Sequence, residues 1–466
     1  MNGSRKFHRR DKTTVAASVA VVFWLLVWQL ASWLYNSPIL LPGPLEVVAA
    51  LVAAASEPRF WLAVARSSFQ IALGIVLAYA LALPLAAVSS RCETVRQFIQ
   101  VPLHAVKAAP IVCIIVLLLL WFGASWVGFA AVVLMALPGL YFPVLTGFDH
   151  MDQGMRELFD VHRVAGARRM LAFSWQQVCP FVRAASAGVV GMSWKAGVAA
   201  ELIGSPAGSM GERIFQAKLL LETADVFAWT VAVVCLAVLF ERLVLALLDG
   251  SIAVSIGLAL RSKGPGARTD RRTCGSLPVV AIDNALTPYG GVSPISLSLD
   301  PGARVCLMAP SGAGKTTCLR MAAGLIEPSS GSVGVHGRLS VQFQDARLIE
   351  SATSVENVLL FAADRYDADG VSSLLLHLVP DIDLDAPVNK LSGGQRRRVE
   401  LLRAMVAPGD AILLDEPFAG LDEATHHLVA AWVKESAGDR ALIVATHDCA
   451  DVELLDAKVY RLGKPA

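Results

Sequence analysis

Charged residues are scarce in this sequence of 466 residues, and neither sign of charge dominates. Only 17% of the residues are charged, and the formal net charge is +1. The sequence contains no nucleic-acid-binding signature. Hydrophobic residues make up 55% and the mean hydropathy is +0.56, which is too apolar for a soluble pair of domains. The composition therefore indicates a membrane protein whose partner is the lipid bilayer.

Paired cysteines are also lacking. The eight cysteines, at positions 92, 113, 179, 235, 274, 306, 318 and 449, show no Cys-x-x-Cys spacing, which disfavours a zinc site. They fall in expected membrane spans or cytosolic segments, so we expect no disulfide bonds. No internal repeat is present either.

Long apolar runs are concentrated before residue 260. Roughly 20 apolar residues span a bilayer, and the chain offers six such segments: Ala16–Tyr35, Trp61–Val88, Gln100–Phe122, Val127–Phe148, Ala184–Ile203 and Val226–Leu248. The first is too long for a cleavable signal peptide, and no small-residue cleavage site follows it. We therefore expect an all-α membrane domain of six helices over residues 1–260.

Six crossings place both termini on the same side of the membrane. The basic residues of the loops identify that side, because positively charged loops stay in the cytoplasm. Those that fall on the side of the termini are Arg5, Lys6, Arg9, Arg10, Lys12, Arg91, Arg96, Arg156, Arg163, Arg168, Arg169, Arg183, Arg261, Lys263, Arg268, Arg271 and Arg272. The opposite loops hold only Arg59, Arg213 and Lys218. Both termini are therefore predicted to be cytoplasmic.

The second half of the chain carries a phosphate-binding loop. A short apolar strand is predicted over Gly302–Met308 and a helix over Cys318–Ala323, and the loop between them contains Ser311, Gly312, Ala313, Gly314, Lys315, Thr316 and Thr317. Its backbone N–H groups would form a nest for the α- and β-phosphates of a nucleotide. Lys315 would reach the β- and γ-phosphates, and the Thr316 hydroxyl would ligate Mg²⁺. Ala309 replaces the first glycine of the motif, which requires a negative φ there.

Two further strands place polar residues at one edge of the predicted sheet. The apolar run Ala411–Leu414 ends in Asp415 and Glu416, and the run Leu442–Ala445 is followed closely by His447. Sheets of α/β proteins bind their ligands at the carboxyl ends of such buried strands. Asp415 would hold the Mg²⁺ shell and Glu416 would polarise an attacking water. His447 would hydrogen-bond a γ-phosphate.

A helix start lies between these strands, in the segment Leu391-Ser-Gly-Gly-Gln395. Ser392 at the N-cap, with Gln395 three residues later, forms a capping box that is predicted to open a helix at Arg396. The glycines beside the cap, Gly393 and Gly394, would let a phosphate approach the exposed N–H groups and the positive end of the helix dipole.

The order of these motifs resembles that of the ATP-binding-cassette (ABC) ATPases. The resemblance implies an α/β P-loop domain over residues 277–466 that uses ATP and Mg²⁺. It also implies that Gln344 senses the γ-phosphate and Mg²⁺, although Gln342 competes for this role. Asp422 matches the loop that follows the catalytic carboxylate in the family. Tyr289 resembles the aromatic residue that stacks on adenine, and the packing of a core edge is the alternative role for it.

The loop between the fourth and fifth apolar segments resembles the conserved-glycine loop of binding-protein-dependent permeases. Asp160, Gly166 and Pro180 match its pattern in part, because the three residues from Asp160 stand where the family has Glu-Ala-Ala and the spacing from Gly166 to Pro180 is one residue longer than usual. The resemblance implies a short helix that docks on the ATPase near Gln344. An ordinary basic loop is the alternative.

Shorter matches resemble one group of permeases, the nitrate, sulfonate, taurine and bicarbonate importers. These matches are Leu41–Pro44, Trp194–Gly204, Glu222–Trp229 and Gln344–Leu348. Lys195 lies within the fifth apolar segment, where a charge costs about 2.5–3.5 kcal/mol or more unless it faces a polar cavity or a partner. Lys195 is therefore a candidate for the translocation path, and a structural pair with a carboxylate on a neighbouring helix is equally open.

Residues 261–276 are rich in Gly, Ser and Arg and are expected to form a flexible basic linker on the cytoplasmic side. The chain thus reads as a fused permease and ATPase of a prokaryotic plasma membrane. In the family, ATP lies between the phosphate loop of one nucleotide-binding domain and the Leu-Ser-Gly-Gly-Gln segment of another. The resemblance therefore implies a homodimer of full chains, served by an extracytoplasmic substrate-binding protein.

The resemblance implies ATP-driven import of a small anion such as nitrate, a sulfonate, taurine or bicarbonate. Import of a vitamin precursor, such as a thiamine pyrimidine or a riboflavin-like solute, is an alternative because the same family includes such importers. An ABC exporter would predict long cytoplasmic helices, and a membrane ATPase that drives a partner protein mechanically would predict a large extracytoplasmic domain. The short loops argue against both.

Overall fold

The computed structural model describes residues 3–35, 37, 39–164, 166–262, 278–289, 293–310, 312–362 and 366–463, with side chains from residue 19 onward. The chain folds into two compact units. The first combines Met1–Asp149 with Pro180–Leu248, and the second combines His150–Cys179 with Asp249–Ala466. The units therefore do not follow the expected division at residues 260 and 277, and most of the expected linker lies outside the described residues.

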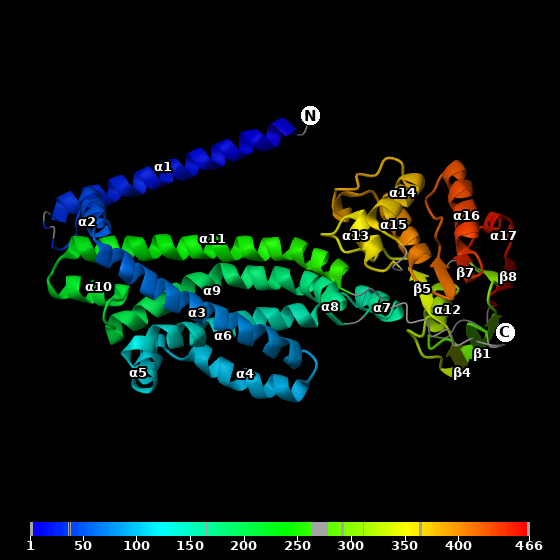
Figure 1. The fold of residues 1–466 in the computed structure, drawn as a ribbon, viewed down its shortest axis with the longest axis horizontal. Helices are drawn as coiled ribbons and strands as arrows, with labels where there is room; N and C mark the ends of the chain where they lie inside the picture. The colour runs from blue at the N-terminus through cyan, green and yellow to red at the C-terminus, as the bar shows by residue number, and fades with distance from the viewer. Residues whose placement is uncertain are drawn as a thin grey trace. The chain divides into compact units, whose positions relative to one another are not determined.

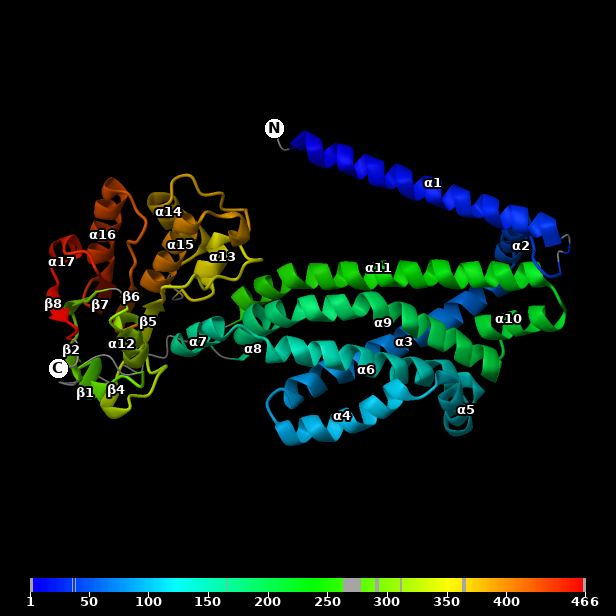
Figure 2. The ribbon, with the colours of Figure 1, turned by 180° about the vertical axis from the view of Figure 1, so that it is seen from behind.

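The first unit is all α. Its helices are α1 (Gly3–Tyr35), α2 (Pro44–Ser56), α3 (Pro58–Ser89), α4 (Glu93–Ala108), α5 (Ile111–Phe122), α6 (Val127–Asp149), α10 (Met210–Leu219) and the larger parts of α9 (Trp175–Gly204) and α11 (Thr223–Arg261). Both views show α3 lying against α6, whereas α1 runs apart from the other helices except toward its C-terminal end (Figures 1 and 2). There it lies beside α2 and the start of α11, and the Trp28 ring is 5.7 Å from that of Phe227.

Two glycines allow α3, α6 and α9 to approach closely. A Cβ atom added to Gly74 of α3 would lie 2.7 Å from Val132 of α6, and one added to Gly197 of α9 would lie 2.8 Å from Ile71 of α3. Ile71 and Val132 are themselves fully buried. Small residues at helix contacts are the usual means by which apolar helices pack in a membrane. These three helices form the centre of the first unit.

Fewer helices qualify as membrane spans than the six segments predicted. Within the described residues, three stretches are long and apolar enough, namely Pro58–Ser89, Ala124–Asp149 and Thr223–Arg261. The segment predicted as Gln100–Phe122 is broken, because α4 and α5 meet at a 110° bend. Pro110 explains the break: the residue before a proline avoids the helical region, and Ala109 is extended at ψ 139°. Counted as one broken span, the pair gives a fourth crossing.

The remaining two predicted spans are not among the three stretches, for separate reasons. Helix α9 has 30 residues but is not apolar enough to qualify. The first predicted span begins at Ala16, before the residues whose side chains are described, so Val19–Tyr35 covers only part of it. The helical nature of the first unit is confirmed, and the six crossings remain a prediction.

A buried carboxylate that no sequence motif marks joins α3, α9 and α10. Glu201 of α9 is fully buried, and its Oε2 accepts hydrogen bonds from Ser67 Oγ at 2.7 Å and from the N–H of Gly211 at 3.2 Å. Ser67 Oγ in turn accepts from the N–H of Met210 at 3.0 Å. One side chain thereby satisfies donors from two other helices, including the first turn of α10.

We expect Glu201→Ala to destabilise the first unit, because a buried donor left without an acceptor costs about 1–3 kcal/mol. The thermal midpoint of the full chain in detergent should fall clearly, and Glu201→Gln, which keeps an acceptor oxygen, should lose less. Glu222→Ala is the matched control, since Glu222 is an exposed carboxylate of the same unit. Equal midpoints for the two alanine variants would contradict this role of Glu201.

The second unit contains two sheets. A five-stranded sheet has the order β5-β6-β7-β3-β8 with all neighbours parallel, and a three-stranded antiparallel sheet has the order β2-β1-β4. The strands are β1 (Val280–Leu286), β2 (Ile295–Leu299), β3 (Arg304–Met308), β4 (Ser330–Val335), β5 (Leu339–Gln342), β6 (Ala411–Asp415), β7 (Ala441–Thr446) and β8 (Lys458–Arg461). The strands predicted from the apolar runs are confirmed as β3, β6 and β7.

Helices accompany the two sheets. They are α12 (Lys315–Ala322), α13 (Ser354–Leu359), α14 (Ala368–Leu378), α15 (Gly393–Val406), α16 (Glu423–Ala437) and α17 (Ala450–Leu455). Helices α12, α15 and α17 pack on strands, whereas α13 and α14 pack on α15 and on each other. The α/β architecture predicted for the C-terminal half is confirmed.

Two segments from the first half of the chain complete this unit. They are the loop with α7 (Gln153–Val161) and α8 (Gly166–Arg169), and the end of α11. Phe159 of α7 stacks on Phe173 at 5.2 Å and meets Phe361 edge-on at 5.0 Å. Ile256 and Ala259 of α11 belong to the same apolar core. The loop and the end of α11 are therefore part of the second unit's core.

Candidate functional site

The polar residues predicted for nucleotide chemistry gather where four neighbouring parallel strands end. Gln342 ends β5, Asp415 ends β6, Thr446 ends β7 and Ala309 follows β3. Because parallel strands run in one direction, their carboxyl ends lie at the same edge of the sheet. The structure thus brings together residues that are up to 137 positions apart in the sequence, from Ala309 to Thr446 (446 − 309).

The loop between β3 and α12 has the backbone of a phosphate nest. Gly312 and Gly314 have φ of +80° and +87°, a region that side chains disfavour. Helix α12 begins at Lys315, three residues before the predicted start. Lys315 is buried, and its Nζ donates to the carbonyl of Ala309 at 2.7 Å. Ala309 is not among the described residues with a positive φ, so its methyl group is compatible with the loop. Ser311 lies outside the described residues.

Asp415 and Thr316 form the candidate metal site. Asp415 is buried and is hydrogen-bonded to the Thr316 side chain; burial raises the pKa of Asp415, and the hydrogen bond from Thr316 opposes this. Its Oδ2 has no hydrogen-bond partner within the described part of the chain. A carboxylate oxygen with spare lone pairs beside a hydroxyl suits Mg²⁺, which prefers oxygen ligands. These two residues therefore fit the ion, whereas Gln344, the third predicted ligand, is exposed in the loop after β5.

The predicted base and the predicted phosphate ligand are near each other. Glu416 follows β6, and its Oε1 lies 3.9 Å from Nδ1 of His447. The Glu416 side chain is mostly buried, with 23% exposed, whereas that of His447 is 68% exposed. The backbone N–H of Glu416 donates to the carbonyl of Ala445 in β7 at 2.9 Å. The arrangement presents a carboxylate and an imidazole at the sheet edge that also carries the phosphate loop.

The predicted capping box is present, but its helix starts earlier than expected. Ser392 is the N-cap of α15, its side chain accepts from the N–H of Gln395 at 3.3 Å, and Gln395 accepts from the N–H of Ser392 at 3.0 Å. The helix begins at Gly393 rather than at Arg396, because the residues that follow an N-cap are already helical. Neither Gly393 nor Gly394 has an atom within 4 Å of the position of an added Cβ.

The other predicted nucleotide residues differ in their surroundings. Asp422 is the N-cap of α16 and accepts hydrogen bonds from the N–H and the hydroxyl of Thr425 at 3.0 and 2.7 Å, which lower its pKa. Tyr289 is 79% exposed, so it does not pack against a core edge formed by the described residues. Of the two competing glutamines, Gln342 is buried and Gln344 is exposed, so only Gln344 is open to an external group.

Helix α7 is the part of the permease-like loop that contacts the residues after β5. The carboxylate of Glu157 accepts from Arg347 Nη1 at 3.1 Å and also pairs with Arg320 of α12. Arg347 Nη1 also donates to the carbonyl of Gly154 at 3.0 Å. Arg347 stands three residues after Gln344, and docking of the helix around Gly166 near Gln344 stays a prediction. No sequence signal marked Glu157, which precedes the Glu-Ala-Ala position by three residues.

The three predicted loop residues lie elsewhere. Asp160 pairs with Arg169 at the surface, and Gly166 starts α8 with a φ of +63°, which suits glycine. Pro180 lies within α9, where the first unit resumes. The segment around Gly166 contacts the carbonyl of Leu360 through Arg168 Nη1 at 3.1 Å.

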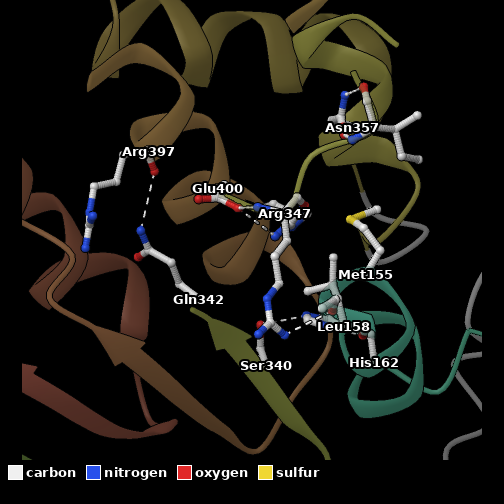
Figure 3. Close-up of polar contacts among 12 residues, drawn as sticks. Met155, Leu158, His162, Ser340, Gln342, Arg347, Asn357, Arg397 and Glu400 are labelled. Atoms are coloured by element: carbon white, nitrogen blue, oxygen red, sulfur yellow. Dashed lines mark hydrogen bonds and ion pairs between the residues drawn. The ribbon is translucent and has the colours of Figure 1, made fainter. Parts of the chain in front are cut away.

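A buried histidine fills the third position of the Glu-Ala-Ala pattern. His162 Nδ1 is 3.0 Å from the carbonyl of Leu158, its Nε2 is 3.4 Å from Ser340 Oγ in β5, and its ring meets Phe361 edge-on at 5.1 Å. Figure 3 shows His162 between α7 and β5. Burial, reinforced by the charge of Arg403, lowers the pKa of His162 to about 4. The imidazole is therefore neutral at physiological pH.

The depressed pKa of His162 predicts acid sensitivity. Above pH 6.5, the ordinary pKa, the residue is neutral in both states; as the pH falls from 6.5 to about 4 the unfolded chain gains the proton first, so stability is lost. The loss is on the order of 2 kcal/mol at pH 5. On acidification from pH 7.5 to 5, the thermal midpoint of His162→Gln should therefore fall less than that of the unmodified chain. His427 is exposed, so the midpoint of the control variant His427→Gln should fall by as much as that of the unmodified chain. Identical pH dependence for His162→Gln would contradict the burial argument.

Lys195, the candidate for the translocation path, has an exposed side chain on α9. It forms no ion pair with any of the described residues, so the structural pair that was the alternative is not seen among them. Glu201, six residues later, is occupied by Ser67 and Gly211.

Comparison with known proteins supports the same assignment. Residues 292–419 match a family model described as ABC transporter. The aliphatic sulfonates import ATP-binding protein SsuB of Granulibacter bethesdensis is 36% identical over 190 residues, which cover 40% of this chain and 80% of that protein. The cytochrome c biogenesis ATP-binding export protein CcmA of Sphingopyxis alaskensis is 34% identical over 168 residues, covering 35% of this chain and 86% of that protein.

A third relative, the thiamine import ATP-binding protein ThiQ of Vibrio vulnificus, is 34% identical over 186 residues, covering 36% of this chain and 80% of that protein. The chain spans more than two thirds of each of these relatives and carries the motifs of the family in order. The chain therefore belongs to the ABC transporter family, among the nitrate and sulfonate importers, and is an ATP hydrolase coupled to transport.

Proposed function

We propose that this chain imports a small anion across the prokaryotic plasma membrane as a homodimer of full chains. The observation that carries the proposal is the sheet edge where Lys315, the Asp415–Thr316 pair and the Glu416–His447 pair meet. Import of an anion is supported by the similarity to an aliphatic sulfonates import ATPase at 36% identity. The apolar helices of the first unit support a membrane domain, and we propose, from the basic residues of the loops, that it is multi-pass with both termini in the cytoplasm.

At this edge each residue has a distinct task. Lys315 and the N–H groups of residues 312–317 bind the phosphates of ATP, and Thr316 and Asp415 hold Mg²⁺. The bound ion would neutralise charge on the phosphate oxygens. Glu416 accepts a proton from the attacking water, and His447 hydrogen-bonds the γ-phosphate. The positions of the side chains and the motifs that carry them support these roles.

The start of α15 is built to receive a group from outside its own chain. Gly393 and Gly394 are exposed, have no left-handed φ and have nothing within 4 Å of an added Cβ. Neither the backbone nor the packing of this chain therefore demands glycine there. Their lack of side chains leaves the N–H groups of a helix N-terminus open to a phosphate. We infer that the phosphate belongs to ATP held by Lys315 of a second copy, with Tyr289 and Asp422 beside the same nucleotide.

Mixed dimers test this shared site. Chains with Lys315→Ala and chains with Ser392→Ala would be co-expressed with different tags, and dimers that carry both tags isolated. One of their two sites pairs an intact phosphate loop with an intact Ser392, whereas both sites of each mutant homodimer are damaged. We expect about half of the unmodified ATPase rate if the two sites act independently, and any rate well above that of both mutant homodimers supports shared sites. A fully active monomer would contradict the model.

The solute and the delivery protein are inferred from the family. We propose that an extracytoplasmic binding protein delivers the anion and that Lys195 lies on its path. The similarity to a thiamine import protein keeps a vitamin precursor as the second candidate, and the similarity to an export protein keeps export as a lesser one. ATPase stimulation in liposomes, measured with the binding protein loaded with each solute of a panel, distinguishes them. Stimulation only by a cationic or uncharged solute would contradict anion import.

We further propose that the loop of α7 and α8 couples hydrolysis to transport through Glu157. Its carboxylate is largely buried, with 12% exposed, and pairs with Arg347, which has 8% exposed. Breaking a buried pair by removing one partner leaves the other charge uncompensated, and this costs more than losing a surface pair. Asp160, which stands at the family's glutamate position, makes only a surface pair with Arg169. Gly166 provides the turn into α8.

Two neutral substitutions distinguish these carboxylates. Glu157→Gln should keep most of the basal ATPase rate, because Glu157 touches no predicted ATP ligand, and should lose most of the stimulation by the binding protein and most of the uptake. Asp160→Asn is the matched control and should behave like the unmodified chain in both assays. If uptake is unaffected by Glu157→Gln but abolished by Asp160→Asn, the coupling residue is Asp160, at the family's glutamate position, and not Glu157.

A further inference from the structure

Glu416 stands on an unusual piece of backbone. Its φ is +48°, in the left-handed region that costs residues other than glycine about 1–3 kcal/mol. Such a conformation persists only where surrounding contacts hold it. The N–H of Glu416 is bonded to the carbonyl of Ala445, which fixes one side of the residue. The carbonyls of Asp415 and Glu416 also need partners if the left-handed conformation of Glu416 is to be held.

Arg397 of α15 is the partner of both carbonyls. Its Nη2 donates to the carbonyl of Asp415 at 3.1 Å and also to the carbonyl of Glu416. These carbonyls belong to the peptide groups before and after the Cα of Glu416, so one nitrogen restrains both the φ and the ψ of Glu416. The two bonds join the helix of the Ser392 capping box to the end of β6.

Arg397 is itself fixed by the sheet. Its carbonyl accepts a hydrogen bond from Nε2 of Gln342 at 3.4 Å, and Gln342 is fully buried at the end of β5. Figure 3 shows this bond beside the Glu400–Arg347 contact. The main chain of Arg397 is therefore hydrogen-bonded to the end of β5, while its guanidinium is hydrogen-bonded to the carbonyls at the end of β6.

The same helix also bonds the segment that receives α7. Glu400 stands three residues after Arg397, on the same side of α15. It accepts a hydrogen bond from the N–H of Arg347, and the guanidinium of Arg347 donates to Glu157 of α7. One side of α15 thus holds both the backbone of Glu416 and the arginine that binds the loop from the first half of the chain.

We propose that Arg397 is a positioning residue for hydrolysis. It holds the left-handed turn at Glu416, keeps that carboxylate beside His447, and makes the position of the carboxylate depend on α15 and hence on the contact between Arg347 and α7. This rests on the proposed role of Glu416 as general base. A displacement of about 1 Å in a catalytic group can cost on the order of 100-fold in rate, so loss of the two carbonyl bonds should act mainly on kcat.

Single-turnover hydrolysis by the full chain in nanodiscs tests the proposal. Arg397→Met should lower kcat about 10- to 100-fold while the Kd for ATP and the thermal midpoint stay near those of the unmodified chain. Arg397→Lys, which keeps a charged donor, should recover part of the rate. The matched control is Arg396→Met, because the neighbouring Arg396 pairs with the exposed carboxylate of Glu350 at 2.9 Å and should leave kcat unchanged.

A second background separates positioning from other effects. Glu416→Gln alone should reduce hydrolysis strongly, and adding Arg397→Met to it should lower the rate no further, because there is no longer a base to position. Unchanged kcat in Arg397→Met overturns the proposal. The proposal is also overturned if the lower kcat of Arg397→Met is accompanied by equally weaker ATP binding or by a lower thermal midpoint. It is overturned as well if Arg397→Met lowers the rate of Glu416→Gln further. Near-normal turnover by Glu416→Gln would instead refute the base assignment, whatever the result for Arg397→Met.

Discussion

The buried carboxylate of Glu400 is the contact around which the second unit is organised. It accepts from the N–H of Arg347 and pairs with Arg403 at 3.5 Å. Burial raises the pKa of Glu400, and the charges of Arg403 and Arg347 oppose that shift. Three charged side chains share this interior, so each one depends on the others for its pairing. The backbone N–H of Arg347 is bonded to Glu400 of α15, and the side chain of Arg347 is bonded to Glu157 of α7. Arg347, in the loop after β5, therefore connects α15 to α7.

Local sequence signals were sufficient for three strands of this unit, β3, β6 and β7, and insufficient for the hydrogen bonds and ion pairs that join its elements. Apolar runs bounded by glycine and acidic residues predicted β3, β6 and β7, because a strand buried on both faces must be continuously apolar. Helices α12 and α15 begin three residues before their predicted starts, since both were placed after their first turn. Glu157 and Arg397 were missed for a different reason. Their partners are 190 and about 19 residues away, and no local pattern records which partner a charged side chain will meet.

The first unit shows the same limit in a membrane setting. Hydropathy averaged over a segment does not register a single break, so the predicted third span ran through Pro110, where α4 and α5 bend apart. Averaging also gave no reason to single out Glu201. Ser67 and Gly211 donate to one oxygen of this buried carboxylate from other helices, which offsets part of the cost of burying it. Its other oxygen, Oε1, has no hydrogen-bond partner within the described residues. Lys195 and Glu201 therefore lie on the same helix, but the Lys195 side chain is exposed and that of Glu201 is buried and hydrogen-bonded.

Hydrogen bonds, more than hydropathy, explain why the end of α11 belongs to the second unit. The last carbonyls of a helix have no partner within it, and those at the end of α11 are used by Arg168, which donates to Ala259, Leu260 and Ser262. The same guanidinium reaches Leu360, next to α13. An apolar helix that hydropathy assigns wholly to the membrane domain is thus fastened at its end to the ATPase fold. The end of α11 is therefore held within the second unit by hydrogen bonds that are made before residue 263.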